Sequence, residues 1–304
     1  MTTKTVWVFP GQGSQAVGMG ADLAEVAQEK FAQADDILGW SVLDFCQSDN
    51  AQLGNTLYTQ PCLYVVECAL ADLLKAKGLQ PDMVAGHSLG EYSALYVADV
   101  FDFAAGLRLV KRRAELMSQA EDGAMAALMG FARDELDAKI AVTEGVVLAN
   151  DNNPGQVVIS GTPKAVETVM AGIKTKRAVK LNVSGAFHSP LMSPAAREFD
   201  QILTDMPFKA ATVPVLSNVD PLPSVDGEVL KQRLMKQMTG TVRWREISLS
   251  LPDQAVDTVL EVGPGKVLAG LIKRTCRSLT LNNVATLEQL ETVASALSQV
   301  EVTV

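Results

Sequence analysis

A serine between two glycines is the first feature of this sequence that could carry out chemistry. Gly86-His87-Ser88-Leu89-Gly90 follows a short apolar run, Met83 to Ala85, and precedes a stretch compatible with a helix, Glu91 to Val100. A strand, a sharp turn and a helix in that order form a nucleophile elbow, which presents the serine hydroxyl above a sheet. The N-terminus of the helix favours negative charge at the turn. A bare Gly-x-Ser-x-Gly string also occurs in ordinary turns, but this context favours a nucleophile at Ser88.

Two histidines, His87 and His188, are the candidate bases for Ser88, because the chain has no others. A serine hydroxyl is a weak nucleophile at neutral pH and needs an adjacent base, usually histidine. His87 precedes Ser88 on the same sharp turn, where neighbouring side chains diverge, so we expect that it does not reach the serine oxygen. His188 remains, in the loop Gly185-Ala186-Phe187-His188-Ser189-Pro190. A lone histidine is more often a surface or satisfied core residue, so this assignment depends on Ser88 being catalytic.

A glycine loop follows the first apolar run of the chain. The segment Phe9-Pro10-Gly11-Gln12-Gly13-Ser14-Gln15-Ala16 formally matches the dinucleotide fingerprint Gly-x-Gly-x-x-Gly/Ala. We reject that interpretation, since a Rossmann unit continues through a helix into a second strand that ends in an acid about 20 residues on, whereas Glu29 to Leu38 has a helical pattern. Two interpretations remain: a plain turn, or a loop whose backbone N–H groups help to hold an oxyanion.

One arginine lies at the border of a predicted buried helix face. From Asp102 onward, apolar residues fall on one stripe at helical spacing, namely Phe103, Leu107, Val110, Ala114 and Met117. Arg108 and Arg112 then point to solvent, while Lys111 and Arg113 flank the stripe. Arg113 could bind a carboxylate through two parallel hydrogen bonds. The periodicity equally allows an arginine that packs its aliphatic stem on the core.

The elements that would position these residues alternate between short strands and helices. Apolar runs at Thr5 to Phe9, Met83 to Ala85, Val213 to Leu216 and Val259 to Val262 each end near a loop, and the last precedes a helical stretch, Lys266 to Lys273. Such alternation predicts an α/β fold with a mostly parallel sheet covered by helices.

The middle of the chain has a different pattern. Its predicted order is strand, helix, strand, strand, helix, strand, which is the ferredoxin-like arrangement. We interpret residues 124–193 as a small ferredoxin-like subdomain inserted into a large α/β domain made of residues 1–123 and 194–304. The predicted elements are Ala124 to Phe131, Arg133 to Ile140, Val146 to Ala149, Gln156 to Ser160, Pro163 to Ile173 and Ala178 to Val183.

Composition excludes several classes of protein. The chain of 304 residues is 48% hydrophobic and 20% charged, the usual balance of a globular protein. Its net charge of -9 argues against an extended grip on nucleic acid. No apolar run is long enough for a signal peptide or a membrane span, so we expect a cytoplasmic protein without membrane contact. Two distant histidines and four scattered cysteines predict no metal site.

Two clusters of basic residues stand out in this acidic chain. They are Lys174, Lys176, Arg177 and Lys180, and Lys273, Arg274 and Arg277. Most such clusters are solvated faces, and a docking role is the alternative.

Taken together, five segments of the sequence resemble the malonyl-CoA:acyl carrier protein transacylases of type II fatty acid synthesis. The likeness runs in order over nearly the whole chain. The segments are Phe9 to Gln15, Gly86 to Glu91, Arg113, Ala186-Phe187-His188, and Glu261-Val262-Gly263-Pro264-Gly265.

The resemblance implies an α/β-hydrolase-like large domain and transfer of a malonyl group from malonyl-CoA to the phosphopantetheine thiol of an acyl carrier protein, in fatty acid or polyketide synthesis. It makes Ser88 the nucleophile and His188 its base, with Arg113 on the malonyl carboxylate. It implies an oxyanion hole from the backbone N–H groups of Gln12 and Leu89.

The same resemblance extends to residues around the site. It makes Gln237 the residue whose backbone carbonyl orients the histidine, and places Asn152, as a substrate-binding residue, and Asn218 near the active site. It implies no cofactor beyond the coenzyme A thioester, which is a substrate. A monomer is the expected assembly.

Two rivals stay open at this point. A serine esterase or thioesterase would share the elbow, although its usual acid partner for the histidine cannot be identified in the sequence. A non-catalytic docking module for carrier proteins would form no adduct on Ser88.

Overall fold

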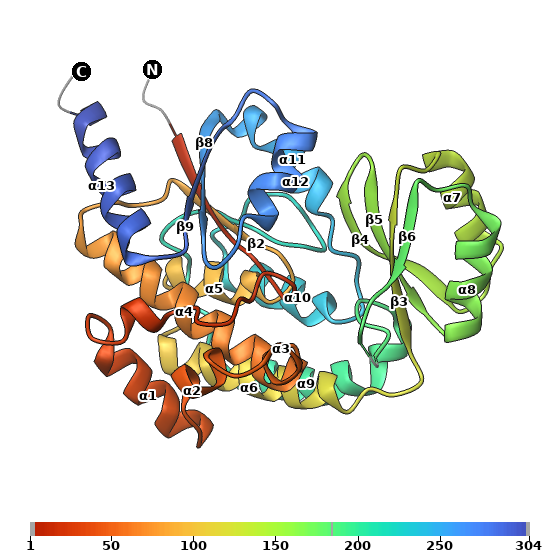
Figure 1. Cartoon of the computed structure of the whole chain (residues 1–304), viewed down its shortest axis with the longest axis horizontal. Helices are drawn as coiled ribbons and strands as arrows, with labels where there is room; N and C mark the ends of the chain where they lie inside the picture. The colour runs from red at the N-terminus through yellow and green to blue at the C-terminus, as the bar shows by residue number, and fades with distance from the viewer. Residues whose placement is uncertain (1–3, 184, 302–304) are drawn as a thin grey trace.

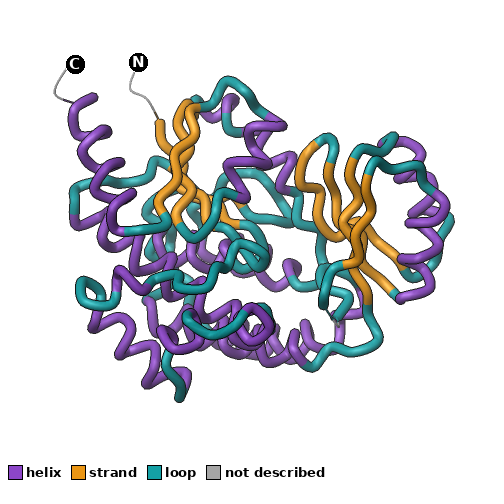
Figure 2. Tube along the Cα trace, viewed as in Figure 1, coloured by secondary structure: helices purple, strands orange, loops and turns teal. Residues whose placement is uncertain are grey.

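The structure, a computed structural model, describes residues 4–183 and 185–301 and contains two sheets that lie apart (Figures 1 and 2). The larger sheet has five strands in the order β7-β2-β1-β8-β9, and every neighbouring pair is parallel. Its strands are β1 (Lys4–Phe9), β2 (Met83–Gly86), β7 (Val215–Leu216), β8 (Val256–Val262) and β9 (Thr280–Val284).

The central strand β1 explains why this sheet needs cover on both faces. Trp7 and Phe9 join one apolar cluster, whereas Val6 and Val8 join another. Successive side chains of a strand point to opposite faces, so an uninterrupted apolar run requires helices on each side. The predicted parallel sheet covered by helices is therefore confirmed.

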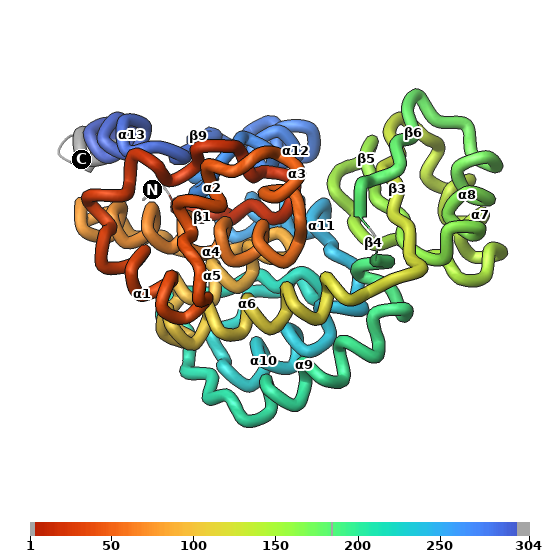
Figure 3. Tube along the Cα trace, turned by 60° about the horizontal axis from the view of Figure 1, so that its bottom comes forward, coloured from red at the N-terminus to blue at the C-terminus, as the bar shows by residue number. Residues whose placement is uncertain are grey.

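Helices from several parts of the chain provide that cover. The longest is α4 (Thr56–Ala76), which is buried along most of its length. The larger sheet and the helices around it form what we call the large body. Its helices are α1 (Gln28–Leu38), α2 (Val42–Cys46), α3 (Asn50–Leu53), α4, α5 (Gly90–Val97), α6 (Phe103–Ser118), α9 (Ser193–Asp205), α10 (Gly227–Gln237), α11 (Trp244–Ser250), α12 (Val267–Thr275) and α13 (Leu287–Glu301). Figure 3 shows α6, α9 and α10 side by side, with the chain leaving α6 for the second sheet.

The second sheet forms a separate small subdomain on one side of the molecule (Figure 1). Its strand order is β4-β5-β3-β6, with every neighbouring pair antiparallel. Together with the order of its elements, this is the ferredoxin-like arrangement predicted from the sequence. The elements are β3 (Ala124–Met129), α7 (Arg133–Ala141), β4 (Val146–Asn153), β5 (Gln156–Gly161), α8 (Pro163–Gly172) and β6 (Arg177–Lys180). The division of the chain at residues 124–193 stays a prediction.

Several predicted elements are shorter than expected, and three of them differ by two or more residues near the elbow, in the large sheet or at the edge of the small sheet. Helix α5 stops at Val97 rather than Val100, and Asp99 has a φ of 61° that a continuing helix does not allow. Strand β7 holds two residues instead of the predicted four, because Pro214 has no N–H for a ladder. Strand β6 ends at Lys180 and not at Val183.

Two further observations concern predicted features of the whole chain. No helix in the part of the chain that the structure describes is long and apolar enough to cross a membrane. The cysteines are free thiols; Cys46, Cys62 and Cys68 are buried, and Cys276 is half-buried.

Candidate active site

Ser88 lies on the sharp turn between β2 and α5. Its φ of 53° is in the left-handed region, which a serine adopts only where the surroundings hold it. A Cβ atom on Gly86 would lie 1.9 Å from the backbone carbonyl of Gly90, and one on Gly90 would lie 2.0 Å from the carbonyl oxygen of Phe9. Both glycines are therefore required for strand, turn and helix to pack this closely.

His188 reaches Ser88 across 100 positions of sequence. Its Nε2 lies 2.8 Å from Oγ of Ser88, and its Nδ1 lies 2.9 Å from the backbone carbonyl oxygen of Gln237. A carbonyl oxygen can only accept, so Nδ1 carries the proton and Nε2 faces the serine with its lone pair. The arrangement can remove the hydroxyl proton.

The imidazole of His188 is kept neutral. Burial, with a smaller contribution from the positive charge of Arg113, lowers the pKa of His188 to about 3. A neutral ring near pH 7 is the form that can accept a proton.

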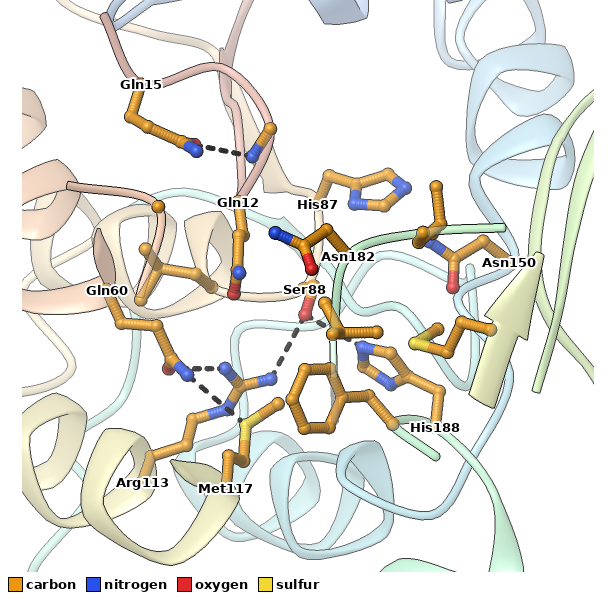
Figure 4. A pocket seen from close by; sticks show the side chains of 17 residues that line it. Gln12, Gln15, Gln60, His87, Ser88, Arg113, Met117, Asn150, Asn182 and His188 are labelled. Carbon is orange, nitrogen blue, oxygen red and sulfur yellow. Dashed lines mark hydrogen bonds between the residues drawn. The ribbon is translucent and has the colours of Figure 1, made fainter. Parts of the chain in front are cut away.

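Arg113 on α6 is fully buried beside Ser88 (Figure 4). Its Nη1 donates to Oε1 of Gln60 over 2.6 Å, while Nη2 lies 3.0 Å from Oγ of Ser88 and 3.1 Å from Oε1 of Gln237. Burial lowers the pKa of the guanidinium. Within the described residues it has no carboxylate in ion-pair contact. Glu91 and Tyr92 act on its charge without an ion-pair contact. A buried cation that lacks such a contact is costly, so an anionic ligand would be favoured here.

A cavity of about 360 Å³ opens over these groups. Ser88, Arg113 and His188 are among the residues that line it, and Figure 4 shows their side chains converging. Residues from both bodies of the molecule line it, including Gln12, Gln60, Leu89, Met125, Asn150 and Asn182. The cavity can accept a small acyl group and leave room for the chain that carries it.

The loop after β1 lies directly against the elbow. A Cβ on Gly11 would lie 2.4 Å from the carbonyl oxygen of His87, so the two turns are in backbone contact. The backbone N–H groups of Gln12 and Leu89 have no acceptor among the described residues. Leu89 precedes the first residue of α5, where free N–H groups are expected. Two free donors beside Ser88 could stabilise a developing oxyanion.

Comparison with known proteins shows the family of this chain. The sequence model of the acyl transferase domain matches residues 6–299. The malonyl CoA-acyl carrier protein transacylase of Synechocystis is 58% identical over 95% of this chain and 100% of its own length. Its crystal structure covers the same shares, with a TM-score of 0.94. The chain belongs to the malonyl CoA-acyl carrier protein transacylase family.

Two other similar proteins mark the breadth of this transacylase family. A polyketide biosynthesis malonyl CoA-acyl carrier protein transacylase of Bacillus subtilis is 43% identical over 88% of this chain and 96% of its own length. A transacylase solved in complex with a type II polyketide acyl carrier protein is 38% identical, with a TM-score of 0.91, and covers 97% of this chain and 100% of that one.

Two residues predicted to lie near the transacylase site have contacts that the sequence did not indicate. Asn152 is buried, and its Oδ1 lies 2.9 Å from Nε2 of His87, whereas it is Asn150 that lines the cavity. Asn218 accepts a hydrogen bond from the backbone N–H of Ser88 over 2.7 Å. The substrate-binding role of Asn152 stays a prediction, and its observed contact is with His87.

The hydrogen bond and the ring contact of His87 are with residues other than Ser88. The histidine ring binds Asn152 and packs on Trp244, with ring centroids 5.6 Å apart. The expectation that it does not reach the serine oxygen fits this placement.

Sequence reasoning missed two buried polar residues that hold the site together. Gln60 binds Arg113, and its Nε2 donates to Thr56 over 2.8 Å. Glu91 accepts from Nε2 of Gln237 over 2.8 Å and from the backbone N–H of Asn218 over 3.2 Å. An isolated Gln within the apolar α4 was the available signal for the first residue; Glu91 looked like an ordinary first-turn acid.

Among the residues that the structure describes, no group of three or more His, Cys, Asp or Glu side chains could hold a metal ion.

Proposed function

We propose that this chain transfers a malonyl group from malonyl-CoA to the phosphopantetheine thiol of an acyl carrier protein, through an ester on Ser88. The single observation that carries the substrate assignment is Arg113, a buried guanidinium 3.0 Å from the serine oxygen with no carboxylate in ion-pair contact among the described residues. A malonyl group supplies the missing anion, whereas an acetyl group would leave the desolvation cost uncompensated.

The first half-reaction forms the ester. Ser88 Oγ attacks the thioester carbonyl carbon while its proton moves to Nε2 of His188. The backbone N–H groups of Gln12 and Leu89 stabilise the tetrahedral oxyanion. The carbon–sulfur bond then breaks, and the departing coenzyme A sulfur takes the proton from His188.

The second half-reaction reverses these steps with a different thiol. The phosphopantetheine thiol gives its proton to His188 and attacks the ester carbonyl carbon, and the bond to Ser88 Oγ breaks as the oxygen regains a proton. The carbonyl of Gln237 holds His188 in the tautomer that both halves need. No cofactor enters either step, since the thioester itself is the activated donor.

We further propose that the protein acts in the cytoplasm, as a monomer, without contact to nucleic acid or membrane. Relatives named for polyketide biosynthesis and relatives without that label are similar to the chain, so the carrier can belong to either pathway.

Intact-protein mass spectrometry after incubation with malonyl-CoA tests the proposal. We expect a malonyl adduct on Ser88 that disappears when holo acyl carrier protein is added, with malonyl recovered on the carrier. Ser88→Ala should form no adduct. Rapid release of free malonate without a carrier would favour a thioesterase, and carrier binding without any adduct would favour a docking module.

A further inference from the structure

The two bodies of the molecule meet along β4, whose pairing with β5 is interrupted twice. The register skips Ala149 and then Asn152, so each is a bulge residue without a partner in the small sheet. Bulges near active sites redirect a strand and its side chains. Here they turn β4 toward the large body, and Figures 1 and 3 show α11 next to this strand.

The freed backbone of β4 pairs with the segment just before α11. Val242 N–H donates to the carbonyl oxygen of Ala149 over 2.8 Å, and Asp151 N–H donates to the carbonyl oxygen of Val242 over 2.9 Å. The hydroxyl of Thr241 adds a bond of 2.7 Å to the carbonyl of Leu148. A short parallel bridge between residues 149–151 and Val242 therefore joins the small subdomain to the large body. We call this contact the joint.

A buried carboxylate closes this joint. Both oxygens of Asp151 accept from Nη1 of Arg133 at 3.1 Å, and Oδ2 also accepts from Nε of Arg245 at 3.0 Å. Arg133 begins α7 of the small subdomain, and Arg245 lies on α11 of the large body. The carboxylate is 4% exposed, and its removal would leave the two guanidinium groups without the anion that they share.

Both neighbours of Asp151 in sequence lie at the site. Asn150 lines the cavity, and Asn152 binds His87, which precedes the nucleophile. On the other side of the joint, Trp244 packs on the ring of His87, and Arg243 N–H donates over 3.0 Å to the carbonyl of Asn218, the residue that binds the backbone of Ser88. A shift at the joint would thus move the wall of the cavity and the support of the elbow together.

We propose that Asp151 is a positioning residue: its bridge between Arg133 and Arg245 sets the place of the small subdomain against the nucleophile elbow. It touches neither the acyl group nor the reacting atoms, and it acts through Asn150, Asn152 and His87. The inference rests on the proposed function, since it assigns Asp151 a part in malonyl transfer. The reactions affected are those of substrates long enough to contact both bodies, namely the pantetheine thioesters.

The test compares Asp151→Asn with Asp137→Asn. Asp137 is a matched control because it also pairs with Arg133, at 2.8 Å, but lies on α7 and does not join the two bodies. Two rates are measured for each variant. The first is acylation of Ser88 by malonyl-CoA in a single turnover, and the second is labelling of Ser88 by phenylmethylsulfonyl fluoride, a reagent much shorter than a pantetheine thioester.

We expect Asp151→Asn to slow acylation by malonyl-CoA roughly tenfold or more, because a displacement of about 1 Å far from the chemistry can cost up to about a hundredfold. Labelling by the sulfonyl fluoride should slow much less, because that reagent makes fewer contacts with the small subdomain than a pantetheine thioester does, and Asp137→Asn should change neither rate. Arg245→Gln should repeat the effect of Asp151→Asn, and the double variant should add no further loss, because both break one bridge. Arg245→Gln also serves if Asp151→Asn does not fold.

A spectroscopic readout is independent of turnover. With two histidines in the chain, the imidazole nitrogen-15 NMR signals of His87 can be resolved and assigned. They should shift in Asp151→Asn, as the bond to Asn152 is disturbed, and stay in place in Asp137→Asn. Equal loss of both rates, or identical behaviour of the two Asp variants, would overturn the inference. If the unsubstituted protein takes no malonyl group, the proposed function fails, while the His87 signals still decide whether Asp151 positions the elbow.

Discussion

Nη2 of Arg113 donates to Oγ of Ser88 over 3.0 Å, so the residue that would bind the acyl carboxylate already contacts the atom that would carry the acyl group. Gln60 and Gln237 hold the same guanidinium from other directions. The guanidinium therefore needs little reorganisation to meet a malonyl group on the serine. Such preorganisation makes selectivity depend on one fixed charge.

Replacing Arg113 with alanine should remove this selectivity. We expect malonyl-CoA to acylate Ser88 about 10- to 100-fold more slowly, since a charge-assisted hydrogen bond contributes about 1.5–3 kcal/mol, and acetyl-CoA to become a competing substrate. Single-turnover acylation with both thioesters measures the ratio. Arg112→Ala is the control, because the neighbouring arginine pairs with Glu115 and Glu198 away from the site. An unchanged preference for malonyl-CoA in Arg113→Ala would contradict the assignment.

The two histidines should differ sharply in their effect on rate. His188→Ala should slow formation of the adduct by about 10²- to 10⁴-fold, the usual contribution of a general base. His87→Ala should cost much less, because that ring supports the turn through Asn152 and Trp244 and does not accept the serine proton. Burst kinetics with malonyl-CoA distinguish the two variants. Equal losses would mean that His188 is not the base.

Folding stability should fall in mild acid because of His188. Its pKa is 6.5 in an unfolded chain and about 3 in the folded protein, so between these values the unfolded state binds more protons. Stability contributed by the neutral ring is fully present above pH 6.5 and is lost as the pH falls toward 3. Between pH 7 and pH 5 the unsubstituted protein should lose about 2 kcal/mol more than His188→Gln. Urea unfolding at both pH values measures this difference, and parallel losses would refute the lowered pKa.

The tight turn predicts opposite effects of alanine at two glycines. Gly90→Ala should destabilise the fold by about 3 kcal/mol or more, because its Cβ would overlap the backbone of Phe9 and Pro10. Gly270→Ala, within α12, should stabilise by up to about 1 kcal/mol, since nothing lies within 4 Å of its Cβ and alanine favours a helix. Thermal unfolding of the two variants provides the measurement. A neutral Gly90→Ala would mean that the strand and the helix are less closely packed than described.

The parts of the candidate site that depend on local geometry could be predicted from the sequence. The turn from Gly86 to Gly90 needs small residues at both ends, so Ser88 could be predicted as a candidate nucleophile from the motif alone. His188 could be chosen because the chain offers two histidines and the backbone carries His87 away from its neighbour. The two sheets followed from the change in the order of predicted strands and helices.

The polar groups that meet across long stretches of chain could not be predicted in this way, because their contacts depend on how the elements pack. Gln60 and Arg113 are separated by 53 positions, and Glu91 and Gln237 by 146, and no periodicity reports such pairs. Asn152 turned toward His87, and Asp151 toward two arginines, because bulges in β4 redirect its side chains, and alternation along a strand does not predict a bulge. Arg113 is a further example. Periodicity placed it at the edge of a buried helix face, but only the packed structure shows that its guanidinium is buried without a carboxylate in ion-pair contact among the described residues.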